Sequence, residues 1–181
     1  LEVFRQQQPQ LNIHLSTSST HADLISERFD MAIRLGRMHD SNLRAVQLST
    51  FEVFAVAAPG LIERFAPVAT LATLESMPTL GHGRVPEMTV TDPHGAEHFY
   101  QPKPGTTAIV ADNSATLRAF ALTGQGVAIL PQWLIQEDLE AGRLARLLPD
   151  YRFAQQGVYA LYPDTRHLPL KVRAFIDFMK S

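Results

Sequence analysis

The periodicity of apolar residues changes twice within the first 36 residues, which limits the folds open to the chain. Apolar and polar residues alternate over residues 11–15, which predicts a half-buried strand. A capping-box pattern at residues 20–23 predicts a helix over residues 20–28. A short apolar strand over residues 31–35 follows, ended by Gly36. The order strand, helix, strand predicts a βαβ unit, and therefore an α/β fold with a parallel, helix-flanked sheet.

The rest of the chain continues this mixture of strand and helix patterns. Strands are expected over residues 46–58 (two apolar stretches), 89–90, 99–100, 107–111, 127–130 and 158–162. Helices are expected over residues 1–8, 59–65, 114–123, 133–141 and 172–179. The helix around residues 115–122 is apolar on nearly every side, which predicts burial on several sides or against a partner subunit.

A stretch rich in proline and glycine interrupts the regular pattern at residues 76–106. Such composition predicts turns and short strands. We therefore expect a second lobe inserted into the first, with the chain crossing between lobes twice. The predicted lobes are residues 1–50 with residues 157–181, and residues 51–156.

Composition excludes several classes of protein. The formal net charge is −2 and no basic stripe is visible, so this chain alone should not hold DNA well. The absence of cysteine excludes disulfides and thiolate metal sites. No apolar run approaches the roughly 20 residues of a membrane span, and no signal peptide is visible. The chain begins with Leu1 rather than Met, as expected for an excerpt that starts inside a helix.

Three segments place polar side chains just after a strand and before a helix, where unpaired backbone N–H groups favour an anion. The candidate binding residues in them are Thr17, Ser18, Gly81, His82, Asn113 and Ser114. The alternative is ordinary helix capping, which uses the same residue types. Arg34, within an apolar strand pattern, could grip a carboxylate in bidentate fashion or pair with a nearby acidic residue.

Other motifs favour neither a metal site nor an enzyme. His94 and His98 are four apart, but Pro93 and Gly95 argue against a helix that would place them on one face, so we expect no zinc site. The Gly124-Gln125-Gly126 stretch follows a helix and precedes a strand, the reverse of a phosphate-binding loop. We expect Gly124 to cap the helix and Gly126 to allow a tight turn. Trp133 is expected to be a packing residue.

Five stretches, each weak alone, are specific in their order and spacing. They are FDMAIRLG at residues 29–36 with DSNL at 40–43, AAPGL at 57–61, DNS at 112–114 through GQGVAILP at 124–131, GRL at 142–144 with LLP at 147–149, and VYALYP at 158–163 with Arg166 and VRAFIDF at 172–178. Together they resemble the effector-binding domain of LysR-type transcriptional regulators over nearly the whole chain.

The resemblance implies two Rossmann-like lobes, similar to type II periplasmic binding proteins, with a small effector in the cleft between them. Thr17 and Ser18 match a loop that commonly faces the effector. Residues 80–82 match a strand end of the second lobe at the cleft, and Asn113 with Ser114 match the helix start across it. The family's first strand, with its following loop, and its DNA-binding winged helix-turn-helix are expected upstream of Leu1.

The resemblance also implies a cytoplasmic homodimer, tetrameric in the full-length protein, without a cofactor. DNA would then be bound only through the helix-turn-helix. A periplasmic solute-binding protein of a transporter is the alternative, because it shares the lobed architecture. A secretory signal upstream would favour the transporter, and a basic helix-turn-helix would favour the regulator. An enzyme would need a nucleophile–base pair or a metal cluster, and the sequence offers neither.

Overall fold

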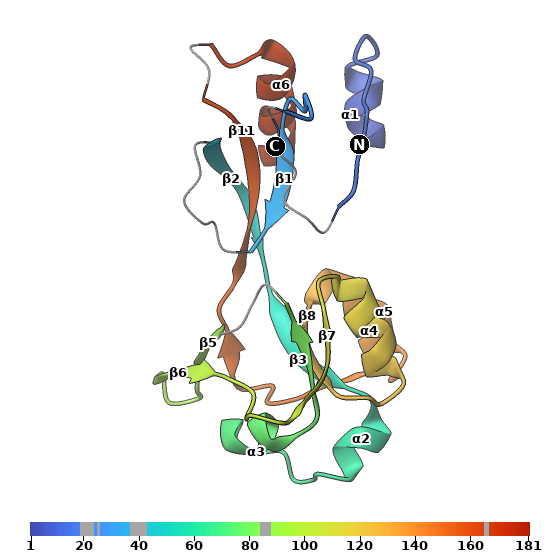
Figure 1. Ribbon diagram of the computed structural model, residues 1–181, viewed down its shortest axis with the longest axis vertical. Coiled ribbons are helices and arrows are strands. Elements are labelled where there is room, and N and C mark those ends of the chain that lie inside the picture. Colours follow the sequence, from blue (N-terminus) through green and yellow to red (C-terminus); the bar gives the residue numbers. More distant parts are fainter. Residues whose placement is uncertain (19–23, 25, 37–42, 84–87, 165–166) are drawn as a thin grey trace. The chain divides into compact units, whose positions relative to one another are not determined.

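The computed structural model describes residues 1–18, 24, 26–36, 43–83, 88–164 and 167–181 (Figure 1). The chain divides into two compact units. Unit 1 comprises Leu1–Thr50 and Gln156–Ser181, and unit 2 comprises Phe51–Gln155. Among the described residues, no helix is both long enough and apolar enough to cross a membrane.

Unit 1 is built around a three-stranded sheet in the order β1-β11-β2. Its elements are α1 (Glu2–Gln7), β1 (Ala32–Leu35), β2 (Leu43–Phe51, which ends at the first residue of unit 2), β11 (Gln156–Pro163) and α6 (Leu170–Lys180). Val172 and Ile176, one turn apart on α6, pack with Ala160 of β11. The ring of Phe4 on α1 meets that of Phe175 edge-on at 5.1 Å. Phe4 is buried, and its ring also lies 5.2 Å from that of Phe178.

The βαβ prediction for unit 1 is wrong. Residues 11–18 form neither helix nor strand, and Ile13 and Leu15 are exposed. An alternating pattern becomes a strand only when a neighbour supplies hydrogen bonds. β1 is a strand as predicted, but it pairs antiparallel with β11, so that Ile33 lies opposite Ala160. Most of the helix expected over residues 20–28 lies outside the described residues.

Unit 2 holds a five-stranded mixed sheet in the order β7-β4-β8-β3-β9 and a small sheet in the order β10-β5-β6. Its strands are β3 (Val53–Ala57), β4 (Thr79–His82), β5 (Met88–Thr91), β6 (Glu97–Tyr100), β7 (Thr107–Ala111), β8 (Val127–Pro131), β9 (Ala145–Arg146) and β10 (Arg152–Phe153). Its helices are α2 (Pro59–Glu63), α3 (Leu71–Ser76), α4 (Ser114–Leu122) and α5 (Gln132–Glu140). β4 runs parallel to β7 and β8, while β3 runs antiparallel to β8 and β9. The parallel strand pairs expected of an α/β fold therefore occur in unit 2.

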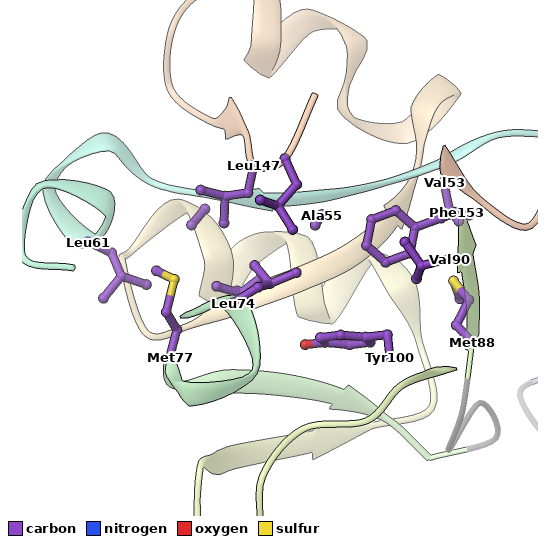
Figure 2. Close-up of a cluster of buried hydrophobic side chains, with 13 residues drawn as sticks. Val53, Ala55, Leu61, Leu74, Met77, Met88, Val90, Tyr100, Leu147 and Phe153 are labelled. Carbon is purple, nitrogen blue, oxygen red and sulfur yellow. The ribbon is translucent and has the colours of Figure 1, made fainter. Parts of the chain in front are cut away.

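Two hydrophobic clusters stabilise unit 2. One joins β3, α2, α3 and the small sheet, and the rings of Tyr100 and Phe153 meet within it at 6.0 Å (Figure 2). The other holds α4 and α5 against the large sheet through residues such as Leu117, Leu130 and Ile135, all without exposed surface. The second cluster holds α4 against the sheet. Two predicted binding residues lie at the start of this helix, Asn113 as its cap and Ser114 as its first residue.

A glycine follows each of α4 and α5, and the one after α4 is the predicted cap. Gly124 after α4 has a φ of +72°, and Gly142 after α5 has a φ of +67°. Gly126 has a different role from the tight turn expected of it. A Cβ atom there would lie 2.9 Å from the carbonyl oxygen of Pro78, so glycine permits a close approach between two chain segments.

Candidate functional site

Parallel pairing brings two of the predicted binding segments to one edge of the large sheet. Gly81 lies opposite Val110, and His82 lies opposite Ala111. Beyond the strands, the N–H of Gly83 donates to the carbonyl oxygen of Ala111 at 3.0 Å. Because β4 and β7 run in the same direction, both end at this edge. His82, which is half-buried, and the start of α4 therefore lie at the same end of unit 2.

Asn113 is the residue that caps α4. Its side-chain oxygen accepts hydrogen bonds from the N–H groups of Ala115 at 2.8 Å and Thr116 at 3.3 Å. Ser114 is the first residue of the helix and is half-buried, so it is not the cap. Asn113 thus satisfies two of the N–H groups that would otherwise attract an anion. The Ser114 hydroxyl and the helix dipole remain as features suited to an anionic ligand.

α4 is less buried than its apolar sequence suggests. Leu117 and Ala121 are fully buried, but Ala119 is exposed and Phe120 retains 37% of its surface. The expectation of burial on several sides is therefore wrong within this lobe, and burial against a partner subunit stays a prediction. The helix packs against the sheet with one face, and short apolar residues such as alanine occupy the solvent side without cost.

Asp138 of α5 is a buried carboxylate that sequence reasoning missed. It is fully buried and pairs with Arg118 of α4 at 2.5 Å and with Arg143 at 2.7 Å. The hydrogen bond from Arg118 is the main reason that the pKa of Asp138 lies below its usual range, against the opposing effect of burial. A signal was present in the sequence, because Asp138 is three residues after Ile135 on the buried face of α5.

The predicted binding residues of unit 1 stand on different elements. Thr17 and Ser18 are exposed and lie in a segment without regular structure, and Ser18 makes a polar contact. Arg34 is half-buried in β1, opposite Tyr159 of β11, and has an interaction partner. The four predicted residues of unit 2 share one sheet edge, so they form the candidate site described here.

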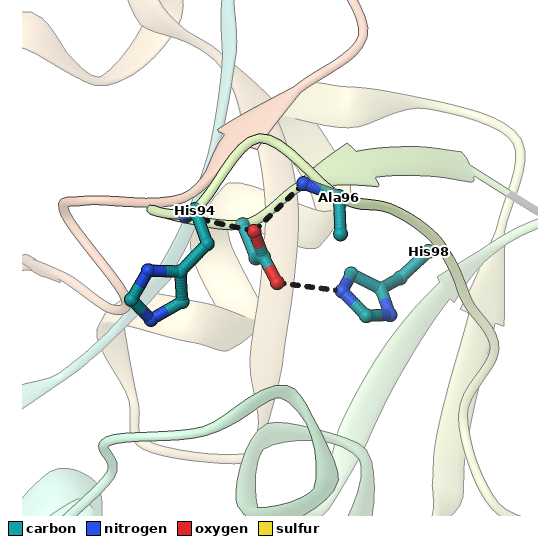
Figure 3. Close-up of polar contacts among 4 residues, drawn as sticks. His94, Ala96 and His98 are labelled. Atoms are coloured by element: carbon teal, nitrogen blue, oxygen red, sulfur yellow. Dashed lines mark hydrogen bonds and ion pairs between the residues drawn. The ribbon is translucent and has the colours of Figure 1, made fainter.

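The Asp92 carboxylate organises the turn of the β5–β6 hairpin, and its partners His94, Ala96 and His98 are labelled in Figure 3. Asp92 accepts hydrogen bonds from the backbone N–H groups of His94 and Ala96, each at 2.9 Å, and its other carboxylate oxygen lies 2.9 Å from Nε2 of His98. These contacts, the one to His98 first, lower the pKa of Asp92. Within the described ranges, no group of three or more acidic, histidine or cysteine residues could hold a metal ion.

Trp133 departs from its expected packing role. Its side chain is 60% exposed and touches the ring of Phe51 edge-on at 6.5 Å. It is the second residue of α5 (Gln132–Glu140).

The fold and the sequence match one family over the full length of the chain. The family model described as LysR substrate binding domain matches residues 1–181. The chain belongs to this family. The sequence-based resemblance and the predicted α/β fold class are therefore confirmed.

Curated relatives with this LysR domain are transcriptional regulators. The HTH-type transcriptional regulator PtxR of Pseudomonas aeruginosa is 35% identical over 180 residues, which cover 99% of this chain and 57% of PtxR. The HTH-type transcriptional activator AaeR of Escherichia coli is 31% identical over 172 residues, covering 93% of this chain and 54% of AaeR. This chain spans little more than half the length of these relatives. They favour the regulator interpretation over the transporter.

Solved LysR regulatory domains share the fold. The regulatory domain of the C227S variant of AphB from Vibrio vulnificus has a TM-score of 0.78 and 27% identity, over 98% of this chain and 87% of that one. The regulatory domain of CrgA from Neisseria meningitidis has a TM-score of 0.74 and 25% identity, over 99% of this chain and 87% of that one.

Proposed function

We propose that this chain is the effector-sensing domain of a cytoplasmic, DNA-binding transcriptional regulator, without enzymatic activity of its own. One observation carries the proposal. Almost the entire chain matches a part of longer proteins that are named as helix-turn-helix transcriptional regulators. A net charge of −2 agrees with a domain that leaves DNA contact to another part of the protein. The full-length protein would form homodimers that assemble into tetramers.

We further propose that the effector is a small organic anion bound at the sheet edge formed by Gly81, His82, Asn113 and Ser114. The start of α4 supplies positive potential and the Ser114 hydroxyl supplies a hydrogen-bond donor. Glycine at position 81 allows Thr107 and Val110 to pack closely against the end of β4, since a Cβ there would lie 3.3 Å from Thr107 and 3.4 Å from Val110. Thr17, Ser18 and Arg34 of unit 1 stay predictions for the same ligand.

A thermal-shift screen of the full-length protein tests the proposal. Small carboxylates, phosphates and matched neutral compounds are compared, because a ligand that binds only the native state raises the melting temperature. We expect stabilisation by one class of carboxylate. Stabilisation by neutral compounds alone would contradict the anionic effector, and conversion of any compound to product would contradict the absence of catalysis.

Substitution at the site then tests the residue assignment. Ser114→Ala should weaken binding of the best stabilising carboxylate about tenfold, the effect of losing one hydrogen bond to a charged group. Ser49→Ala is the matched control, because Ser49 is an exposed hydroxyl on β2 that donates to the adjacent carbonyl of Thr50. Equal affinity for the wild type and the Ser114 variant would remove Ser114 from the site.

A further inference from the structure

Two arginines from different parts of unit 2 share the buried carboxylate of Asp138. One oxygen accepts a hydrogen bond from Nε of Arg118 at 2.5 Å. The other accepts a hydrogen bond from Nε of Arg143 at 2.9 Å and forms an ion pair with its Nη2 at 2.7 Å. The turn that carries Arg143 is also tied to Asp138 by the backbone, since the N–H groups of Arg143 and Leu144 both reach the Asp138 carbonyl oxygen. Arg118 therefore connects Asp138 to α4, whereas Arg143 connects it only to the turn after α5.

Arg118 makes the directional polar contact from α4 to α5. α4 also packs through its apolar residues Leu117 and Ala121, and apolar contacts are not directional. Burial of a paired charge contributes little net stability compared with an apolar residue, but a hydrogen-bonded ion pair has defined geometry. The pair between Arg118 and Asp138 is therefore suited to fixing the rotation and axial position of α4.

The helix geometry places this anchor next to the candidate site. Arg118 is four residues after Ser114, so both side chains project from the same face of α4, one turn apart. We propose that Arg118, held by Asp138, is a positioning residue that sets where the first turn of α4 presents the Ser114 hydroxyl. The inference rests on the proposed effector contact of Ser114. Arg143 stabilises only the turn after α5.

Amide hydrogen exchange of the full-length protein tests this role without any effector. Arg118→Met and Arg143→Met each remove one partner of Asp138 and retain an apolar stem. The reporter is the amide of Leu117, which donates to the Asn113 carbonyl oxygen at 3.2 Å in the first turn. Arg118→Met should accelerate its exchange about tenfold, as expected from the loss of one charge-assisted hydrogen bond. Arg143→Met should leave it unchanged, and Arg118→Lys should restore part of the protection.

Equal acceleration by both methionine variants would indicate a general structural role for the ion pairs and overturn the proposal, as would unchanged exchange in Arg118→Met. Exchange at Leu130 in the buried strand β8 reports global stability in the same experiment. If Arg118→Met unfolds, Arg118→Gln makes the same comparison with a neutral polar group. If the exchange experiment contradicts the positioning role of Arg118, the proposal of effector sensing is not affected. If Ser114→Ala binds the effector normally, Ser114 does not contact the effector, but Arg118 can still anchor α4.

Discussion

Among single residues, Asn113 has the clearest local role, because its side chain determines where α4 begins. Asn113→Ala should lower the free energy of unfolding by about 1 kcal/mol, since the N–H groups of Ala115 and Thr116 lose their acceptor. Asn113→Asp keeps an acceptor and should stay close to the wild type. Urea denaturation measures both. A larger loss for Ser114→Ala than for Asn113→Ala would show that the cap is assigned to the wrong residue.

Asp138 gives unit 2 a pH dependence whose direction follows from its lowered pKa. A carboxyl with a depressed pKa in the folded state stabilises the protein above its unfolded pKa, near 4, and loses that contribution as pH falls through the folded value. Asp138→Asn should cost about 1.5–3 kcal/mol at pH 7. The difference between wild type and variant should shrink as pH falls below about 4. A difference independent of pH in urea titrations would argue against an ionised Asp138.

The sequence predicted the helix start at Asn113 and Ser114 but not the burial of Asp138. Asn113 and Ser114 stand between a strand pattern and a helix pattern, so their place at a helix start could be predicted. Which of the two caps the helix depends on backbone angles that the sequence does not specify. Asp138 was missed because a charged residue in an amphipathic helix is usually exposed, and its partner Arg118 is distant in sequence.

For whole elements, predictions succeeded where a segment specifies its structure locally. β7 covers the predicted residues 107–111, and α4 begins at the predicted Ser114. Residues 11–15 carry an equally clear alternation but form no strand, because pairing depends on a neighbouring segment. α3, which no pattern suggested, is only six residues long, too short for a full amphipathic repeat.

Between α4 and β8, the chain at Gly126 packs closely against Pro78 and Leu80. Gly126→Ala should destabilise the protein by about 1–3 kcal/mol, because its Cβ would meet the Pro78 carbonyl oxygen at 2.9 Å and Leu80 Cγ at 3.1 Å. Gly60→Ala is the control: Gly60 lies in α2 with no atom within 4 Å of the added Cβ, so helix propensity should make the variant neutral or slightly more stable. Similar melting temperatures for the two variants would contradict this account.

At the scale of the molecule, charge predicts that the chain alone binds DNA poorly. With a net charge of −2, it should not retain operator DNA in a mobility-shift assay at about 150 mM salt, whereas the full-length protein should. Retention by the isolated chain that weakens steeply with added salt would reveal a basic surface not evident from composition.

Self-association is the second expectation for the whole molecule. Leu1 keeps 53% of its surface exposed and Phe120 keeps 37%, and symmetric pairing is the commonest way in which proteins cover such residues. Light scattering at micromolar concentration should therefore give a mass above the 20.1 kDa of one chain. A strictly monomeric mass over the whole concentration range would contradict the proposed homodimer.

The division of the chain has a consequence for the order of folding. Unit 2 is one continuous segment, whereas unit 1 is assembled from the two ends of the chain. The strand pair β1–β11 joins residues such as Ala32 and Leu161, so it cannot form during synthesis until all of unit 2 has emerged. A compact unit 2 would shorten the distance that this pairing must close. The inserted lobe would then fold before the split lobe.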